Sequence, residues 1–179
     1  MSESHQRTEV FLKPGEWYFG GAEALIKTLL GSCVSITLWH PRLKLGGMCH
    51  YLLSQRKNGE ISDTFSGRYA DEAMLLLVRE ALRSGRPLRE FQVKLIGGAS
   101  VLSGTERDGQ VTDVPGDNIA MARLLATQLG LNVQAEDFGG SGARLVLFDV
   151  ACGDVWVRQS NEREVPAGSR VSHRRRAST

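Results

Sequence analysis

Two residues of this sequence, Cys33 and His50, carry side chains that together perform nucleophilic chemistry. Cys33 ends the segment Gly31-Ser-Cys, and His50 ends the segment Gly46-Gly-Met-Cys-His. A thiolate attacks carbonyl carbons, and a neighbouring imidazole either takes the thiol proton or, when protonated, lowers the thiol pKa. The pair therefore predicts a thiol centre that hydrolyses an amide bond, provided that the fold brings the two side chains together.

A β-hairpin between the two residues is predicted to do so. Apolar and polar residues alternate over 34–39, which is the period of a half-buried strand, and a second strand is predicted over 45–53. The turn His40-Pro-Arg-Leu between them has proline where the first central residue of a turn favours it. The hairpin thus returns the chain from Cys33 towards His50.

The length of this turn decides whether the two side chains share a face. If Pro41 and Arg42 form a two-residue loop, Cys33 lies directly opposite His50, with Cβ atoms roughly 5 Å apart. A three-residue loop would instead put Cys33 opposite Tyr51 and move His50 to the other face. We predict the first register and keep the second as its alternative.

Gly31 and Ser32 add a second feature of hydrolytic sites. A glycine before the cysteine permits a tight turn and lets a substrate approach the backbone. The amides of Ser32 and Cys33 are then candidates to stabilise an oxyanion, and losing one such donor costs about a hundredfold or more in rate.

The ordinary roles of these residue types compete with the catalytic one. A lone cysteine at a strand start is more often a small buried apolar residue, and a histidine on a half-buried strand is usually structural. We interpret Cys49 and Cys152 as structural. Three cysteines without a CxxC pair or a common zinc spacing predict reduced thiols in a cytoplasmic protein.

The remaining pattern predicts an α+β fold with a β-sandwich or mixed-sheet core and two main helices packed outside. Further strands are predicted over 92–96, 132–137, 143–149 and 155–158. The first helix has apolar residues at helical spacing from Ala70 to Ala81 and stops before Gly85 and Pro87. The second is predicted to begin at Asp117 or Asn118 and to end at Gly130, with these residues inward: Ile119, Met121, Leu124, Leu125 and Leu129.

Composition limits the classes of protein. The chain has 179 residues with 41% apolar content, which suits one folded domain, and a formal net charge of +2, which gives no reason to expect a nucleic-acid partner. It has neither an apolar signal core nor a run long enough to cross a bilayer. We predict a flexible N-terminus over 1–10, a domain over 11–158 and a disordered basic tail over 159–179.

Several motifs together resemble one family. Residues 28–53, TLLGSCVSITLWHPRLKLGGMCHYLL, resemble the signature of the CheD family of chemoreceptor glutamine deamidases. The similarity continues over roughly residues 11–158 and includes these further motifs: Tyr69, Asp71, Ala73 and Met74; Lys94-Leu-Ile-Gly-Gly-Ala; Gly116-Asp-Asn-Ile; and Asp137-Phe-Gly-Gly with Arg144.

The resemblance implies which residues act. The family's nucleophile falls on Cys33 and its histidine on His50. Its third catalytic residue, a threonine, falls on Thr28, although some members carry it one residue earlier, where this chain has Lys27. Gly97-Gly98 and 139–142 are candidates for mobile loops beside an open cleft, with simple turns as the alternative.

The resemblance also implies the reaction and the partners. It implies hydrolysis of glutamine side chains of methyl-accepting chemotaxis receptors to glutamate and ammonia, with no metal and no organic cofactor. The protein would act beside membrane receptors without inserting into the bilayer, and a CheC-type phosphatase is a further expected partner. The alternatives are a non-catalytic adaptor of chemotaxis, or a receptor methyl esterase or transglutaminase that uses the same thiol.

Overall fold

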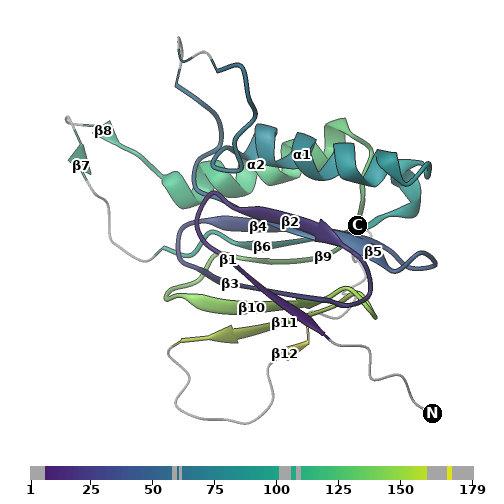
Figure 1. Ribbon diagram of the computed structural model, residues 1–179. Coiled ribbons are helices and arrows are strands. Elements are labelled where there is room, and N and C mark those ends of the chain that lie inside the picture. The colour runs from purple at the N-terminus through teal and green to yellow at the C-terminus, as the bar shows by residue number, and fades with distance from the viewer. Residues whose placement is uncertain are drawn as a thin grey trace, which may run out of the picture.

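Two five-stranded mixed sheets form the centre of the fold, as the computed structural model shows (Figure 1). The structure describes residues 7–57, 60, 62–100, 106–107, 110–160 and 169–170. The first sheet has the strand order β1-β3-β10-β11-β12, and the second has the order β2-β5-β4-β6-β9. The bounds in the first sheet are β1 Thr8–Leu12, β3 Ala24–Leu30, β10 Arg144–Asp149, β11 Asp154–Gln159 and β12 Ser169–Arg170. In the second they are β2 Trp17–Gly20, β5 Leu45–Tyr51, β4 Val34–His40, β6 Gln92–Gly97 and β9 Asn132–Phe138.

Two helices cover the second sheet on the side away from the first sheet (Figure 1). They are α1 (Ala70–Arg83) and α2 (Val114–Gln128). The other described elements are a short 3-10 helix, η1 (Leu88–Glu90), and a two-stranded ladder of β7 (Glu106–Arg107) and β8 (Gln110–Val111). In α1, Asp71 in the first turn and Arg83 in the last complement the helix dipole. Among the described residues, neither helix is long and apolar enough to cross a membrane.

The three layers enclose two separate cores. One lies between the helices and the second sheet and includes Ile36, Cys49 and Leu77. The other lies between the two sheets and includes Ile26, Met48 and Phe148. Because neighbouring residues of a strand point to opposite faces, Cys49 faces the helices while Met48 and His50 face the first sheet. The face of His50 therefore lies in the interior between the sheets.

Four connections cross between the sheets. One of them, over residues 21–23, leads from β2 to β3, and hydrogen bonds gather the other three near one end of the sandwich. Residues 31–33 lead from β3 to β4, residues 13–16 lead from β1 to β2, and residues 139–143 lead from β9 to β10. Gly15 donates to the carbonyl of His50, and Gly98 donates to the carbonyl of Cys33. Cys33 is therefore on the connection that leads from the first sheet to the second.

The predicted fold class is confirmed, and so are the predicted strands and the first helix, within a few residues at their ends. Strands β1, β2 and β3 were not predicted, and β1 begins at Thr8, inside the stretch predicted to be flexible. The predicted tail lies mostly outside the described residues, except that Gln159 ends β11 and residues 169–170 pair with that strand.

The predicted start of the second helix is wrong. It begins at Val114, after Asp113, whose side chain accepts a hydrogen bond from the amide of Gly116. Asn118 is therefore inside the helix and fully buried, and it does not cap the helix. Leu124, predicted to face inward, is 49% exposed, because the buried stripe of the helix runs instead through Asn118, Ala122 and Ala126.

The predicted hairpin register is also wrong. His40 pairs with Leu45, so four residues rather than two form the loop, and Lys44 takes a positive φ of 49° within it. Ser35 then lies opposite His50, and Val34 lies opposite Tyr51. The shift is two residues, an even number, so Cys33 and His50 keep the same face as predicted but are diagonal neighbours rather than opposed.

Candidate active site

His50 and Thr28 meet in the interior between the two sheets. His50 is on β5 and Thr28 is on β3, and their side chains are 2% and 0% exposed. His50 Nδ1 is 2.7 Å from Thr28 Oγ1. Thr28 points inward because β3 alternates, whereas Lys27 points to the other face and binds Glu9 with Nζ 2.7 Å from the carboxylate. The structure thus brings Thr28, and not Lys27, to the histidine.

The hydrogen bonds of Thr28 define the tautomer of His50. The Thr28 hydroxyl donates its proton to the carbonyl oxygen of Leu12 at 2.8 Å. Its oxygen can therefore only accept from His50, so Nδ1 carries the imidazole proton. Nε2 is then unprotonated, and this buried atom has no hydrogen-bond partner. The arrangement holds a free basic nitrogen inside the protein, which is what a general base requires.

The turn that carries Cys33 is held through its carbonyl groups. The carbonyl of Gly31 accepts from the amide of Ala99, and the carbonyl of Cys33 accepts from the amide of Gly98, both at 2.9 Å. The carbonyl of Ser32 accepts from the side chain of Asn118 at 3.3 Å. Within the described part of the chain, the amides of Ser32 and Cys33 donate to no protein group. Both amide protons are therefore left unbonded by the described protein groups.

The half-buried Cys33 packs at the edge of the core between the sheets, the layer that holds His50. Its sulfur makes no hydrogen bond to Nε2 of His50. Cys33 lies beyond the last residue pair of the β4–β5 ladder, Val34 with Tyr51, so no strand pairing sets it directly opposite His50. Catalytic hydrogen bonds are often long before substrate binds and tighten in the complex.

The two groups are neutral in this state. Burial raises the pKa of the Cys33 thiol, and a hydrogen bond with the Ser32 side chain offsets the rise only in part. Burial lowers the pKa of His50 to about 4, against the opposing effects of the Leu12 carbonyl and the Glu16 carboxylate. The thiolate beside an imidazolium that the sequence suggested is therefore not the resting state at neutral pH. Attack by the sulfur would instead coincide with proton transfer to Nε2.

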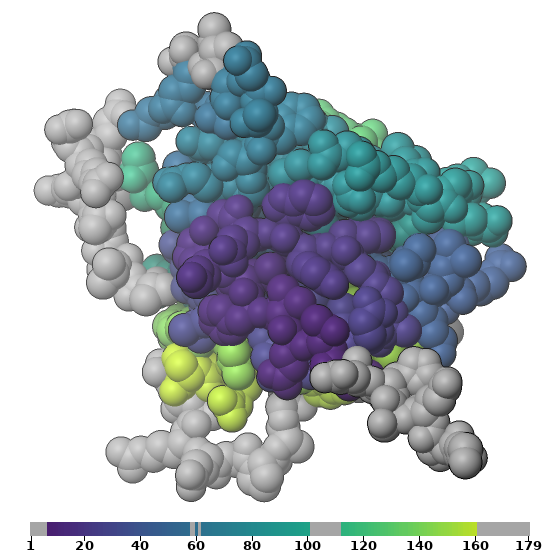
Figure 2. All heavy atoms as spheres, viewed as in Figure 1, coloured from purple at the N-terminus to yellow at the C-terminus, as the bar shows by residue number. Residues whose placement is uncertain are grey.

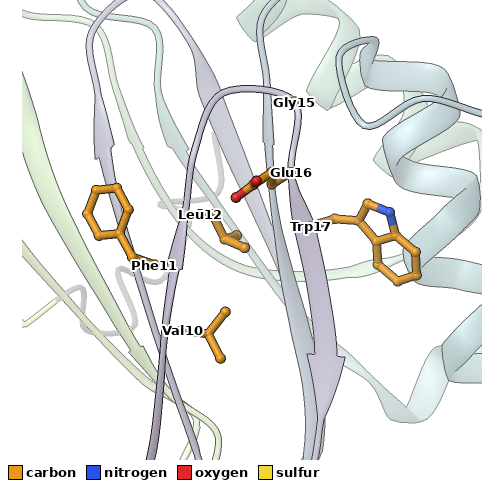
Figure 3. A pocket seen from close by; sticks show the side chains of 6 residues that line it. All are labelled: Val10, Phe11, Leu12, Gly15, Glu16 and Trp17. Atoms are coloured by element: carbon orange, nitrogen blue, oxygen red, sulfur yellow. The ribbon is translucent and has the colours of Figure 1, made fainter.

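A hollow of about 370 Å³ lies where β1 leads into β2. It is lined by Val10, Phe11, Leu12, Gly15, Glu16 and Trp17, and Figure 3 shows Phe11 and Trp17 pointing away from each other on its two sides. Its residues join the histidine strand directly, since His50 exchanges backbone hydrogen bonds with Gly15 and Glu16. Figure 2 shows the N-terminal residues, in purple, on the face turned to the viewer, below the helices and above the C-terminal strands.

Known proteins with similar sequences identify the family. The family model described as CheD chemotactic sensory transduction matches residues 52–159. A protein of Chromobacterium violaceum called probable chemoreceptor glutamine deamidase CheD 1 is 60% identical over 87% of this chain and 80% of its own length. The corresponding CheD 3 of Dechloromonas aromatica is 46% identical over 87% of this chain and 88% of its own. The chain belongs to the CheD family. A CheD protein of Pseudomonas syringae pv. syringae, at 43% identity over 84% of both chains, is a further relative.

The structure places the predicted site residues of this CheD protein in two groups. Gly31, Ser32 and Cys33 form one turn, and His50 and Thr28 form one hydrogen-bonded pair. Of the two glycine segments predicted as flanking loops, Gly97 ends β6 and Gly98 donates to the carbonyl of Cys33, while Gly139 donates to the carbonyl of Gly97. Cys49 is buried on the opposite face, where burial raises its pKa to about 12, and Cys152 is exposed in a turn.

Two contributors to this CheD site were missed from the sequence. The carbonyl of Leu12 fixes the hydroxyl of Thr28, and no sequence signal marks a backbone acceptor on an unpredicted strand. Asn118 binds the turn of Cys33, and its signal was present: it is a polar residue on the same helical stripe as Ala122 and Ala126.

Gly97 allows a close approach of β6 to the turn that carries Cys33, which gives a testable prediction. Its φ is +124°, and an added Cβ would lie 2.3 Å from the carbonyl oxygen of Cys33. We expect Gly97→Ala to displace the turn and to lower both activity and stability, with strain of roughly 1–3 kcal/mol before the clash is counted. Thermal unfolding and deamidation rates measure both effects.

Gly85 provides the matched control. Its φ is also positive, at +75°, but an added Cβ would meet nothing within 4 Å. Gly85→Ala should therefore lower stability through backbone strain alone and leave the deamidation rate unchanged. Equal activity losses in the two variants would contradict a specific role for Gly97.

Proposed function

We propose that this protein is a chemoreceptor glutamine deamidase in which Cys33 is the nucleophile, His50 the general base and acid, and Thr28 the residue that orients His50. The observation that carries the proposal is the buried imidazole whose Nδ1 binds Thr28 at 2.7 Å while Nε2 remains free. Membership of the CheD family, and the names of the relatives, supply the substrate class.

In the first half of the reaction, an amide bond of the substrate is broken. The Cys33 sulfur attacks the side-chain carbonyl carbon of a glutamine as its proton moves to Nε2 of His50. The amides of Ser32 and Cys33 stabilise the negative oxygen that develops. His50 then returns the proton to the nitrogen, ammonia leaves, and a thioester joins the receptor to Cys33.

In the second half, water releases the product. His50 Nε2 takes a proton from a water molecule, and the resulting hydroxide attacks the thioester carbonyl. The sulfur leaves and recovers the proton from His50, which restores the neutral thiol and the neutral imidazole. The receptor now carries a glutamate. Neither step requires a metal or an organic cofactor.

The substrate class implies where the protein works and with what. Glutamines on the helical signalling domain of a chemoreceptor lie in the cytoplasm, so the protein acts there, beside membrane receptors and outside the bilayer. The half-buried position of Cys33 suits a side chain presented on another protein's surface. A CheC-type phosphatase is a second proposed partner.

Deamidation of a receptor fragment tests the proposal. The purified protein is incubated with a cytoplasmic chemoreceptor fragment, and conversion of glutamine to glutamate is mapped by peptide mass spectrometry while ammonia is measured. We expect both products in equal amounts. Methanol release would indicate an esterase, incorporation of an added amine would indicate a transglutaminase, and binding without any product would indicate an adaptor.

Thr28→Val tests the orienting role. The change keeps the volume and removes the acceptor for Nδ1–H, so we expect kcat to fall about tenfold, the equivalent of one hydrogen bond. Thr37→Val is the matched control, because Thr37 is also buried but its hydroxyl contacts the Lys94 carbonyl and not the histidine. An unchanged kcat in Thr28→Val, at unchanged fold, would remove Thr28 from the site.

A further inference from the structure

A single buried amide links the turn of Cys33 to the strand of His50. Asn118 is 0% exposed and lies on α2. Its Nδ2 donates to the carbonyl oxygen of Ser32 at 3.3 Å and to that of Leu52 at 2.8 Å. Both protons of the amide are thereby used, one on each side of the site. This side chain bridges the two segments that carry the reacting groups.

The bridge joins close neighbours of the reacting residues in sequence. Ser32 immediately precedes Cys33, and Leu52 follows His50 by two residues. The β4–β5 ladder reaches Val34 and Tyr51 and stops there, so Cys33 lies beyond its last pair. The amide of Asn118 therefore joins the segments where the sheet no longer does.

Packing alone does not account for an asparagine at position 118, because one atom of its side-chain amide is unsatisfied. Oδ1 is buried and has no hydrogen-bond partner, and an unsatisfied buried acceptor costs stability. Its neighbours on the same helical stripe are Ala122 and Ala126, so an apolar residue would suit this position. The backbone carbonyl of Asn118 is bound separately, by the Tyr51 hydroxyl at 2.6 Å.

We infer that Asn118 is a positioning residue for the reaction: it holds the turn of Cys33 at a fixed place relative to His50, so that the sulfur meets Nε2 when a substrate binds. The inference rests on the proposed roles of Cys33 and His50 and adds a residue of α2 that touches neither of them. Small displacements matter here, since a misplacement of about 1 Å can cost roughly a hundredfold in rate.

Two variants and one control test the inference. Asn118→Leu keeps the size but removes both donors, and Asn118→Asp keeps the shape but, when ionised, places a carboxylate against two carbonyl oxygens. Tyr51→Phe is the control, because it removes a buried hydrogen bond to the same residue but leaves both bonds of the Asn118 amide in place. For each protein, kcat, KM and the melting temperature are measured with the receptor fragment.

A second readout needs no receptor. The rate at which iodoacetamide alkylates Cys33 is followed against pH on the Cys33 peptide, separately from Cys49 and Cys152. Burial of the held turn raises the pKa of the Cys33 thiol, so a released turn should react at lower pH. The two readouts fail separately. Absence of receptor deamidation by the wild-type protein would contradict the proposed function, whereas the alkylation rates of Cys33 in the Asn118 variants would still test the positioning role.

We expect kcat to fall roughly tenfold to a hundredfold in both Asn118 variants, KM to stay within about twofold, and the alkylation profile of Cys33 to move to lower pH. Tyr51→Phe should lose thermal stability but keep the wild-type kcat and profile. The inference is overturned if an Asn118 variant retains the wild-type alkylation profile. It is also overturned if Tyr51→Phe loses as much kcat as Asn118→Leu.

Discussion

Replacing Cys33 by alanine should abolish deamidation, lowering kcat/KM by roughly 10⁴-fold or more, because no other group can form the covalent intermediate. The fold should remain intact, since Cys33 is only half-buried and lies outside the strands. Peptide mass spectrometry of the receptor fragment measures the loss, and thermal unfolding checks the fold.

The other cysteines supply the controls. Cys152 is exposed in a turn, so Cys152→Ala should keep full activity. Cys49 is buried against the helices, so Cys49→Ala should lower stability without removing the reaction. If Cys33→Ala retained activity while Cys49→Ala or Cys152→Ala lost it, the assignment of the nucleophile would be wrong.

Replacing His50 by glutamine should lower kcat about 10² to 10⁴-fold, the usual contribution of general acid–base catalysis. Glutamine can still donate to Thr28 but cannot accept and return a proton. The pH profile provides a second check. Because burial lowers the pKa of His50 to about 4, wild-type activity should stay level as the pH falls through the ordinary histidine range and decline only near the lowered pKa.

His40 is the matched control for His50. It is on the same hairpin and equally buried, at 1% exposed, but its Nε2 binds Glu90 at 2.9 Å and its Nδ1 accepts from the Leu43 amide. His40→Gln should therefore reduce stability and leave the chemistry intact. Equal activity losses in the two histidine variants would show that the effect of His50→Gln is structural.

The sequence predicted the elements that carry a clear local period. The alternation over 34–39 became β4, and the apolar spacing from Ala70 to Ala81 became α1. Strands β1 to β3 were not predicted, although β3 alternates in burial, and their pairing is not local: β1 pairs with β3 in parallel, and β3 pairs with β10. The local sequence of a strand gives little information about a pairing partner that is distant in the chain.

The sequence indicated that Cys33 and His50 share a face, but it did not predict how they are arranged. Cys33 and His50 share a face because the true turn differs from the predicted one by an even number of residues. The four-residue turn includes a positive φ at Lys44. Glycine or asparagine usually takes this conformation, so a lysine there gives no sequence signal for the length of the turn. Thr28 came from the resemblance alone, and its contact with His50 depends on two sheets packing face to face.

The protonation states could not be predicted from the sequence at all. A cysteine beside a histidine suggested an ion pair, but the pKa of each group depends on how deeply the layers bury it. The same burial leaves Nε2 of His50 without a partner, and that atom is the feature on which the proposed mechanism depends.

Trapping the covalent intermediate tests the central claim most directly. The protein and a receptor fragment are mixed for a single turnover and quenched in acid, and the Cys33 peptide is analysed by mass spectrometry with and without hydroxylamine. We expect a receptor peptide joined to Cys33 through its former glutamine, released by hydroxylamine as a hydroxamate and absent in Cys33→Ala. Deamidated receptor that forms without any adduct on Cys33, and at the same rate in Cys33→Ala, would contradict the account.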